Sequence, residues 1–200
     1  MRVHWAAHEL GLDYESQLIG SRTGATQTEE FLALNAKAKI PVLQHNSLIL
    51  TESAAIIHYL DQCAAKTSAL RLIPAEPHEQ VRYQEWQSYI LMELDAQTLY
   101  IMRKHRDLDH IYGSAPAAIE TAESGFNFQV QVAARALEST PFLLGNAFTG
   151  VDILLTTCLD WALAYEFTLA DPLVRYLERI HSRDAYLNAR AHNYSITAGA

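Results

Sequence analysis

The most informative part of the chain is a pair of stretches, KIPVL at residues 39–43 and TESAAIIHYL at residues 51–60. A residue that precedes a proline is pushed into the extended region, and an X–Pro bond can take the cis form. The backbone N–H and C=O of Ile40 are therefore expected to point outward. Two such groups can pair with an extended peptide as an added strand would. The first stretch thus predicts a place for a short peptide next to Pro41.

The second stretch predicts the other end of the same site. The residues between Leu43 and Thr51 leave room for a tight turn and a short returning strand over residues 48–50. Glu52 and Ser53 then stand where a helix begins, and the free N–H groups and dipole of a helix start favour a carboxylate. The Glu52 side chain can accept an ammonium group, so we expect the peptide to carry both charges at this end. The simpler alternatives are a proline that only begins a strand and a helix start that is only capped.

Composition restricts the class of protein. The chain has 200 residues, 50% apolar and 19% charged, which is ordinary for a globular protein. Its formal net charge of −8 argues against a nucleic-acid partner, because such a surface repels phosphates. We find no apolar run long enough to span a membrane and no N-terminal signal core. Cys63 and Cys158 lie far apart in the sequence, each within an apolar helical pattern. We therefore expect the protein to be located in the reducing cytoplasm.

The N-terminal third alternates helix and strand signals. Gly11 is expected to stop the first helix, and Thr28 can cap a short helix whose first turn is acidic. In order, we predict a helix over Val3–Leu10, a strand over Tyr14–Ile19, a helix over Glu29–Leu34, the hairpin of residues 41–50 and a helix from Ser53 to about Ala65. This order is most of a thioredoxin-like unit.

Strand signals disappear after a linker predicted over residues 66–77, which contains two prolines. Apolar residues beyond it recur at helical spacing, and Thr149 and Asp152 form a variant of the capping box. Further helices are predicted over residues 117–138, 172–180 and 183–190. The sequence therefore predicts an α+β protein with a thioredoxin-like domain at 1–65, a linker at 66–77 and an all-helical bundle domain at 78–200.

The stretches around Pro41 and Ser53 resemble the glutathione site of the cytosolic glutathione transferases. In that family the residue before a cis-proline pairs with the cysteinyl backbone of glutathione, and a Glu/Gln-Ser pair holds the γ-glutamyl group. Further motifs match in order and spacing: ELGLDYE at residues 9–15, FLALN at 31–35, FLLGN at 142–146 and FTGVDI at 148–153, with Val151 where the family usually has Ala. The resemblance runs from about residue 2 to about residue 187.

This resemblance implies glutathione as a co-substrate and no metal, with glutathione bound by Lys39, Ile40, Pro41, Glu52 and Ser53. Lys39 could attract the glycyl carboxylate, although a surface lysine is usually only solvated. The implied reaction is conjugation of glutathione with an electrophilic small molecule by a cytoplasmic homodimer, as in detoxification. Two alternatives are a non-catalytic binding or dimerisation module and a glutathione-dependent isomerase or dehalogenase.

The family's activating Tyr, Ser or Cys has no counterpart in this sequence. In the family it lies in a loop before the first helix, and counting back from Gly11 places it before Met1. Ser16 and Ser21 lie on the predicted strand and in a loop, so neither is a convincing replacement. We therefore leave the catalytic residue unknown and favour an N-terminally shortened member without the family's first strand. The alternatives are a rearranged N-terminal unit and a first strand supplied by a partner chain.

Further candidate residues follow from the same resemblance. An acceptor pocket could be lined by Tyr100, Arg103, Trp161 and Phe167, but aromatic residues at helical spacing are more often core. Asp95 stands on the helix that, in the family, often places an acid near the ligand amine of the partner subunit. An exposed helical carboxylate without such a contact is the simpler interpretation of Asp95.

The histidines raise the question of a metal site. His4 and His8 share a helix face at i, i+4 spacing, as metal ligands can. The HExxH pattern is absent, because Trp5 occupies the position of its glutamate. We therefore expect no metal site from the sequence.

Overall fold

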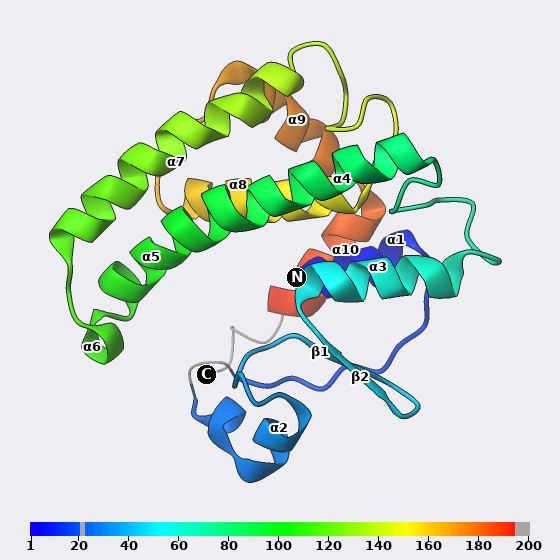
Figure 1. Cartoon of the computed structure of the whole chain (residues 1–200), viewed down its shortest axis with the longest axis horizontal. Coiled ribbons are helices and arrows are strands. Elements are labelled where there is room, and N and C mark those ends of the chain that lie inside the picture. Colours follow the sequence, from blue (N-terminus) through cyan, green and yellow to red (C-terminus); the bar gives the residue numbers. More distant parts are fainter. Residues whose placement is uncertain (21–22, 195–200) are drawn as a thin grey trace. The chain divides into compact units, whose positions relative to one another are not determined.

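The structure is a computed structural model that describes residues 1–20 and 23–194 (Figure 1). The chain divides into two compact units. The N-terminal unit comprises Met1–Leu72 and the described residues from Asn188 onward, and the C-terminal unit comprises Ile73–Leu187. The division falls inside the stretch predicted as a linker. The end of the last helix belongs with the first unit, whereas the sequence places it in the helical domain.

The N-terminal unit is built on helix α1 (Arg2–Glu9), which packs against helix α3 (Ser53–Ala64). Trp5 is fully buried on α1, and Ile56 and Ile57 are fully buried on α3. Helix α1 ends in a Schellman motif, in which Leu12 N–H donates to the Ala7 carbonyl at 3.0 Å. Gly11 supplies the required left-handed conformation with φ +63°, so its predicted role as the stop signal is confirmed.

The strand predicted over Tyr14–Ile19 does not form, and this prediction is wrong. A strand needs a neighbour to which its N–H and C=O groups can bond. Among the described residues the sheet consists of β1 (Val42–His45) and β2 (Leu48–Thr51) alone, and β1 pairs only with β2. The segment after α1 is therefore irregular, and the Tyr14 side chain turns back to contact histidines of α1.

The hairpin and the short helix before it form as predicted. The two strands pair antiparallel from Val42↔Thr51 to His45↔Leu48, joined by a two-residue turn in which Asn46 has φ +55°. Asparagine tolerates that left-handed conformation. After the 3₁₀ turn η1 (Ala25–Gln27), helix α2 (Glu29–Leu34) begins at Thr28, whose hydroxyl accepts the Phe31 N–H at 3.2 Å.

A buried carboxylate fixes the chain where it leaves the N-terminal unit. Asp61 on α3 has a side chain only 1% exposed. Its carboxylate accepts one hydrogen bond from Nη2 of Arg71 at 2.5 Å and another from the Leu72 N–H at 2.6 Å. Leu72 is itself fully buried, so the end of this segment is packed and hydrogen-bonded.

All elements of the C-terminal unit are helical in the part of the chain that the structure describes, so the helical prediction is confirmed. Its elements are α4 (Pro77–Tyr89), π-helical η2 (Ile90–Leu99), α5 (Tyr100–Met102), π-helical η3 (Arg103–Asp107), α6 (Asp109–Tyr112), α7 (Pro116–Ala136), α8 (Gly150–Ala164), α9 (Asp171–His181) and the start of α10 (Asp184–Tyr194). Helix α8 is the central element: it contacts α4 and η2 and buries most of its side chains. Helix α7 packs along η2 and α5 (Figure 1).

The path from α4 to η3 is one continuous helix with two widened stretches. The residues at the junctions, Ile90, Tyr100 and Arg103, all have right-handed helical dihedrals, so no break separates the segments. A π turn closes its hydrogen bond one residue later than an α turn, and such turns are frequent at functional sites. Asp95 lies on η2, and Tyr100 and Arg103 follow it on the same path.

The predicted capping box at the start of α8 is confirmed, and its acid does more than cap. Asp152 is fully buried, and its carboxylate accepts the Thr149 N–H at 2.9 Å. It also accepts the Leu143 N–H at 3.1 Å and the hydroxyl of Tyr176 at 3.1 Å. One side chain thus ties together α8, the preceding loop and α9.

Asp152→Asn should reveal a distinctive pH dependence. Burial raises the pKa of Asp152 from 3.8 to about 6, against the opposing effect of its hydrogen bonds. Because the folded protein then holds this proton more tightly than the unfolded chain, the contribution of Asp152 to stability is greatest below about pH 4. It falls by roughly 3 kcal/mol as the pH rises through 6.

Urea denaturation of both proteins between about pH 4 and pH 7 measures this effect. The wild-type free energy of unfolding minus that of the variant should shrink as the pH rises. A difference that grows with pH would contradict the assignment.

Candidate functional site

The hairpin register brings the two halves of the predicted site together. Val42 pairs with Thr51, so the residues just outside this pair, Pro41 and Glu52, are neighbours at the open end of the hairpin. Neither position is paired in the ladder, and each stands where a backbone segment changes direction. The Ile40 backbone and the start of α3 therefore border one place on the N-terminal unit.

The first half of the site is the segment before β1. The Ile40–Pro41 bond is cis, the form that the sequence allows, and Ile40 is 47% exposed. Among the residues that the structure describes, the backbone N–H and C=O of Ile40 make no hydrogen bond to the rest of the chain. A donor and an acceptor are thus free for an extended ligand.

Asn35 holds this segment in place, although the sequence had given it no role. It is only 5% exposed, and its Nδ2 donates to the Lys39 carbonyl at 2.6 Å. Its Oδ1 accepts the Lys37 N–H at 3.1 Å. The FLALN motif contained this residue, and a buried asparagine just before a loop is the signal that could have identified it.

The second half of the site is the start of α3. Glu52 precedes the helix with φ +71° and ψ +117°, a conformation that is uncommon for a residue other than glycine. The first backbone bond of the helix runs from the Ile56 N–H to the Glu52 carbonyl, and no side chain caps the start. The N–H groups of Ser53 and Ala54 therefore face outward, as an anion site at a helix start requires.

Lys37 is the cation at this site that sequence reasoning missed. Its Nζ donates to Glu52 Oε1 at 2.6 Å and to Thr51 Oγ1 at 2.8 Å. The side chains of Lys37 and Glu52 are 48% and 70% exposed, so the pair contributes little stability and can open easily. Lys39, the lysine that the sequence singled out, is exposed and contacts Asn35 through its backbone carbonyl.

The four predicted acceptor residues all lie in the C-terminal unit. Arg103 places its guanidinium carbon 6.0 Å from the Tyr100 ring, and the Arg103 Nε is buried without a hydrogen-bond partner among the described residues. The Trp161 ring lies 6.0 Å from that of Tyr165.

The Phe167 ring is partly exposed, and its centroid lies 4.7 Å from that of the fully buried Phe126. The acceptor pocket stays a prediction, as does the contact of Asp95 with a partner subunit.

Tyr165 adds a polar element beside Trp161. Its hydroxyl donates to Asp107 at 2.7 Å, and Arg106 lies over its ring at 5.1 Å. Burial, followed by this hydrogen bond, raises the pKa of Tyr165 to about 12. The phenol therefore stays protonated at neutral pH.

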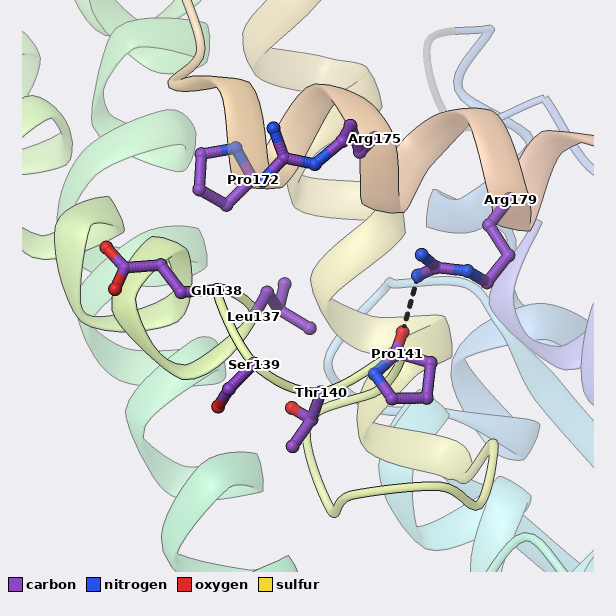
Figure 2. Close-up of a pocket in the computed structure, with 8 residues that line it drawn as sticks. All are labelled: Leu137, Glu138, Ser139, Thr140, Pro141, Pro172, Arg175 and Arg179. Carbon is purple, nitrogen blue, oxygen red and sulfur yellow. Dashed lines mark hydrogen bonds between the residues drawn. The ribbon is translucent and has the colours of Figure 1, made fainter.

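A hollow of about 250 Å³ lies elsewhere in the C-terminal unit (Figure 2). It lies between α9 and residues 137–141, and Arg179 crosses it to donate to the Pro141 carbonyl at 2.8 Å. The hollow is lined by charged and hydroxyl side chains and includes none of the four predicted acceptor residues. Its polarity does not suit an apolar acceptor.

We also searched the described residues for a metal site and for a membrane-spanning helix. Across residues 1–20 and 23–194, no group of three or more His, Cys, Asp or Glu side chains is arranged to hold a metal ion. In the same part of the chain, we find no helix that combines the length and apolar character needed to cross a bilayer.

Known proteins match both the sequence and the fold. Residues 1–63 match the family model for the glutathione S-transferase N-terminal domain. Glutathione S-transferase TCHQD of Arabidopsis thaliana is 27% identical over 188 residues, which cover 79% of this chain and 71% of the relative. The chain is therefore similar to the glutathione transferases, over residues 1–63 by the family model and over most of its length by sequence.

Solved structures of glutathione transferases agree with this assignment. The ternary complex of BphK, a bacterial glutathione transferase, superposes with a TM-score of 0.80 at 26% identity and covers 96% of this chain and 94% of its own. The theta class glutathione transferase of Xanthomonas axonopodis pv. citri, solved with glutathione bound, has a TM-score of 0.77 at 25% identity, covering 94% and 89%. The chain thus has a thioredoxin-like N-terminal domain followed by a helical domain.

Asn35→Ala should lower stability by about 2 kcal/mol, because two partly buried hydrogen bonds to the backbone of Lys37 and Lys39 are lost. Urea denaturation measures the change in the free energy of unfolding. Asn127→Ala on an exposed face of α7 is the matched control and should stay within about 0.5 kcal/mol of wild type. Equal stabilities for wild type and Asn35→Ala would show that Asn35 does not hold the segment before β1.

Proposed function

We propose that the protein is a glutathione transferase that binds glutathione at Lys39, Ile40, Pro41, Glu52 and Ser53 and conjugates it to an electrophilic small molecule. One observation carries the proposal. The register of the hairpin sets the free backbone groups of Ile40 beside the uncapped start of α3. An extended peptide with a zwitterionic end is the ligand that uses both features.

The binding mode follows from the donors and acceptors present. The cysteinyl backbone of glutathione pairs with the N–H and C=O of Ile40, and the γ-glutamyl carboxylate accepts from the Ser53 N–H and hydroxyl at the start of α3. The γ-glutamyl ammonium approaches the Glu52 carboxylate. Because Lys37 holds that carboxylate in the structure, the ligand ammonium must share or replace an exposed ion pair. In this binding mode Lys39 attracts the glycyl carboxylate.

The chemistry depends on the acidity of the bound thiol. A thiol with a pKa near ~8.5 is mostly protonated at neutral pH, and a helix start or a hydroxyl donor lowers that value. The thiolate attacks an electrophilic carbon, and the leaving group departs with the electron pair. The catalytic residue stays unknown. We propose that the acceptor is positioned by Tyr100, Arg103, Trp161 and Phe167.

The second candidate function is glutathione binding without catalysis. The observation that favours it is that the groups at the site, the Ile40 backbone and the N–H groups at the start of α3, are groups that bind a peptide. An isomerase or dehalogenase reaction would need a different acceptor site on the same scaffold. The β-etherase LigF from a Sphingobium strain superposes with a TM-score of 0.86, covering 96% of this chain and 93% of its own, but at 14% identity it is similar in fold alone.

We propose that the protein acts as a homodimer in the cytoplasm. The outer face of α7 carries Phe128, 74% exposed, and Val132, 39% exposed, one turn apart. Such a large exposed aromatic beside a second apolar residue is typical of a surface that is covered in solution. A second copy of the chain is the partner that the similarity to glutathione transferases suggests.

Ser53→Ala should weaken glutathione binding by about 1–2 kcal/mol, because one charge-assisted hydrogen bond is lost. Calorimetric titration of the wild type and the variant with glutathione measures the change. Ser47→Ala, at the far end of the hairpin, is the matched control and should bind as wild type does. If Ser53→Ala binds with unchanged affinity, the assigned site is wrong.

Turnover of a generic aryl halide by the same preparations separates the two candidate functions. Conjugation that falls with Ser53→Ala and not with Ser47→Ala supports the enzyme. Glutathione binding without turnover supports the binding module.

Phe128→Glu should convert the dimer to a monomer, because a buried carboxylate at an apolar interface has no partner. Sedimentation velocity measures the mass of the particle in solution. Val174→Glu, which places a charge on the exposed face of α9, is the control and should leave the dimer intact. A Phe128→Glu protein that remains dimeric would place the interface elsewhere.

A further inference from the structure

Three side chains of the N-terminal unit that are not among the proposed glutathione residues converge on one another. His4 Nδ1 lies 2.9 Å from the Tyr14 hydroxyl, and His8 Nε2 lies 3.4 Å from the same oxygen. The ring of Tyr14 lies 5.5 Å from that of His4 and 5.9 Å from that of His8. Two imidazole nitrogens therefore face one phenol oxygen.

Local structure accounts for this convergence. His4 and His8 are one turn apart on α1 and share a face. The Schellman motif at Gly11 reverses the chain, which returns along that face and carries Tyr14 between the two imidazoles. The strand predicted for Tyr14 would have tied its backbone into a sheet. The irregular conformation places its side chain over the helix instead.

The site is accessible but partly enclosed. Tyr14 is 37% exposed, and both histidines are half-buried. The ring of His192 on α10 lies 4.4 Å from that of His4 and 5.9 Å from that of Tyr14, so it borders both. Metal–nitrogen and metal–oxygen bonds of ~2.0–2.2 Å set their ligand atoms roughly 3 Å apart, which is close to the spacing of the His4 and His8 nitrogens from the Tyr14 hydroxyl.

We propose that His4, His8 and Tyr14 bind a divalent transition-metal ion, with Cu²⁺ preferred. Imidazole suits copper, nickel and zinc, and a mixed nitrogen and oxygen set with open positions favours Cu²⁺, which also leads the general order of affinities. On binding, the phenol releases its proton to solvent and the phenolate oxygen bonds the metal, while water fills the remaining positions. This site uses one tyrosine and two histidines, none of which is a proposed glutathione residue.

The proposal gives a specific spectroscopic expectation. A phenolate bound to Cu²⁺ produces a ligand-to-metal charge-transfer band in the visible range, and imidazole ligands alone do not. The full chain, stripped of metal and free of glutathione, is titrated with Cu²⁺ and followed by absorption and equilibrium dialysis. We expect one tight site per chain, accompanied by this band.

Three variants decide the outcome. Tyr14→Phe should abolish the band, and both Tyr14→Phe and His8→Ala should weaken Cu²⁺ binding at least about tenfold. His78→Ala, an exposed histidine of α4, is the matched control and should leave band and affinity unchanged. A band that survives in Tyr14→Phe overturns the proposal. Equal affinities in wild type, His8→Ala and Tyr14→Phe mean an adventitious ion only and overturn it as well.

Discussion

The pairing of Val42 with Thr51 is the constraint on which the proposed glutathione site depends. A strand has a period of two, so a shift of one residue would move the apolar side chains to the opposite face and separate Pro41 from Glu52. The two-residue turn at Asn46 fixes the register, because its left-handed backbone suits that loop length. The backbone groups of the proposed site are thus positioned by the register of the hairpin.

Buried acids play a parallel role in both units. Asp61 accepts the Leu72 N–H at the end of the first unit, and Asp152 accepts the Leu143 N–H in the loop before α8. In each case an otherwise unpaired backbone donor in an irregular segment receives a strong acceptor from a helix. The loops are held by hydrogen bonds to rigid elements, so the segments that connect the helices are well positioned without regular structure of their own.

Local patterns with a single physical meaning could be predicted from the sequence. The stop at Gly11, the cap at Thr28 and the capping box at Asp152 depend on residues a few positions apart, and all three form. The strand over Tyr14–Ile19 failed because pattern alone cannot tell whether a neighbouring strand exists. Lys37 was missed for a similar reason, since its contact with Glu52 depends on how the loop before β1 folds back.

The widened helix of the C-terminal unit has a consequence for length variation among similar chains. Ten consecutive residues from Ile90 to Leu99 adopt π geometry, and the chain returns to α geometry at Tyr100. Loss of one residue from such a stretch can be absorbed if the wide turns tighten, with the helix axis continuous on both sides. The same loss within α8, buried along most of its length, would rotate every following side chain out of its packing position. Loss of one residue is therefore easier to accommodate in η2 than in α8.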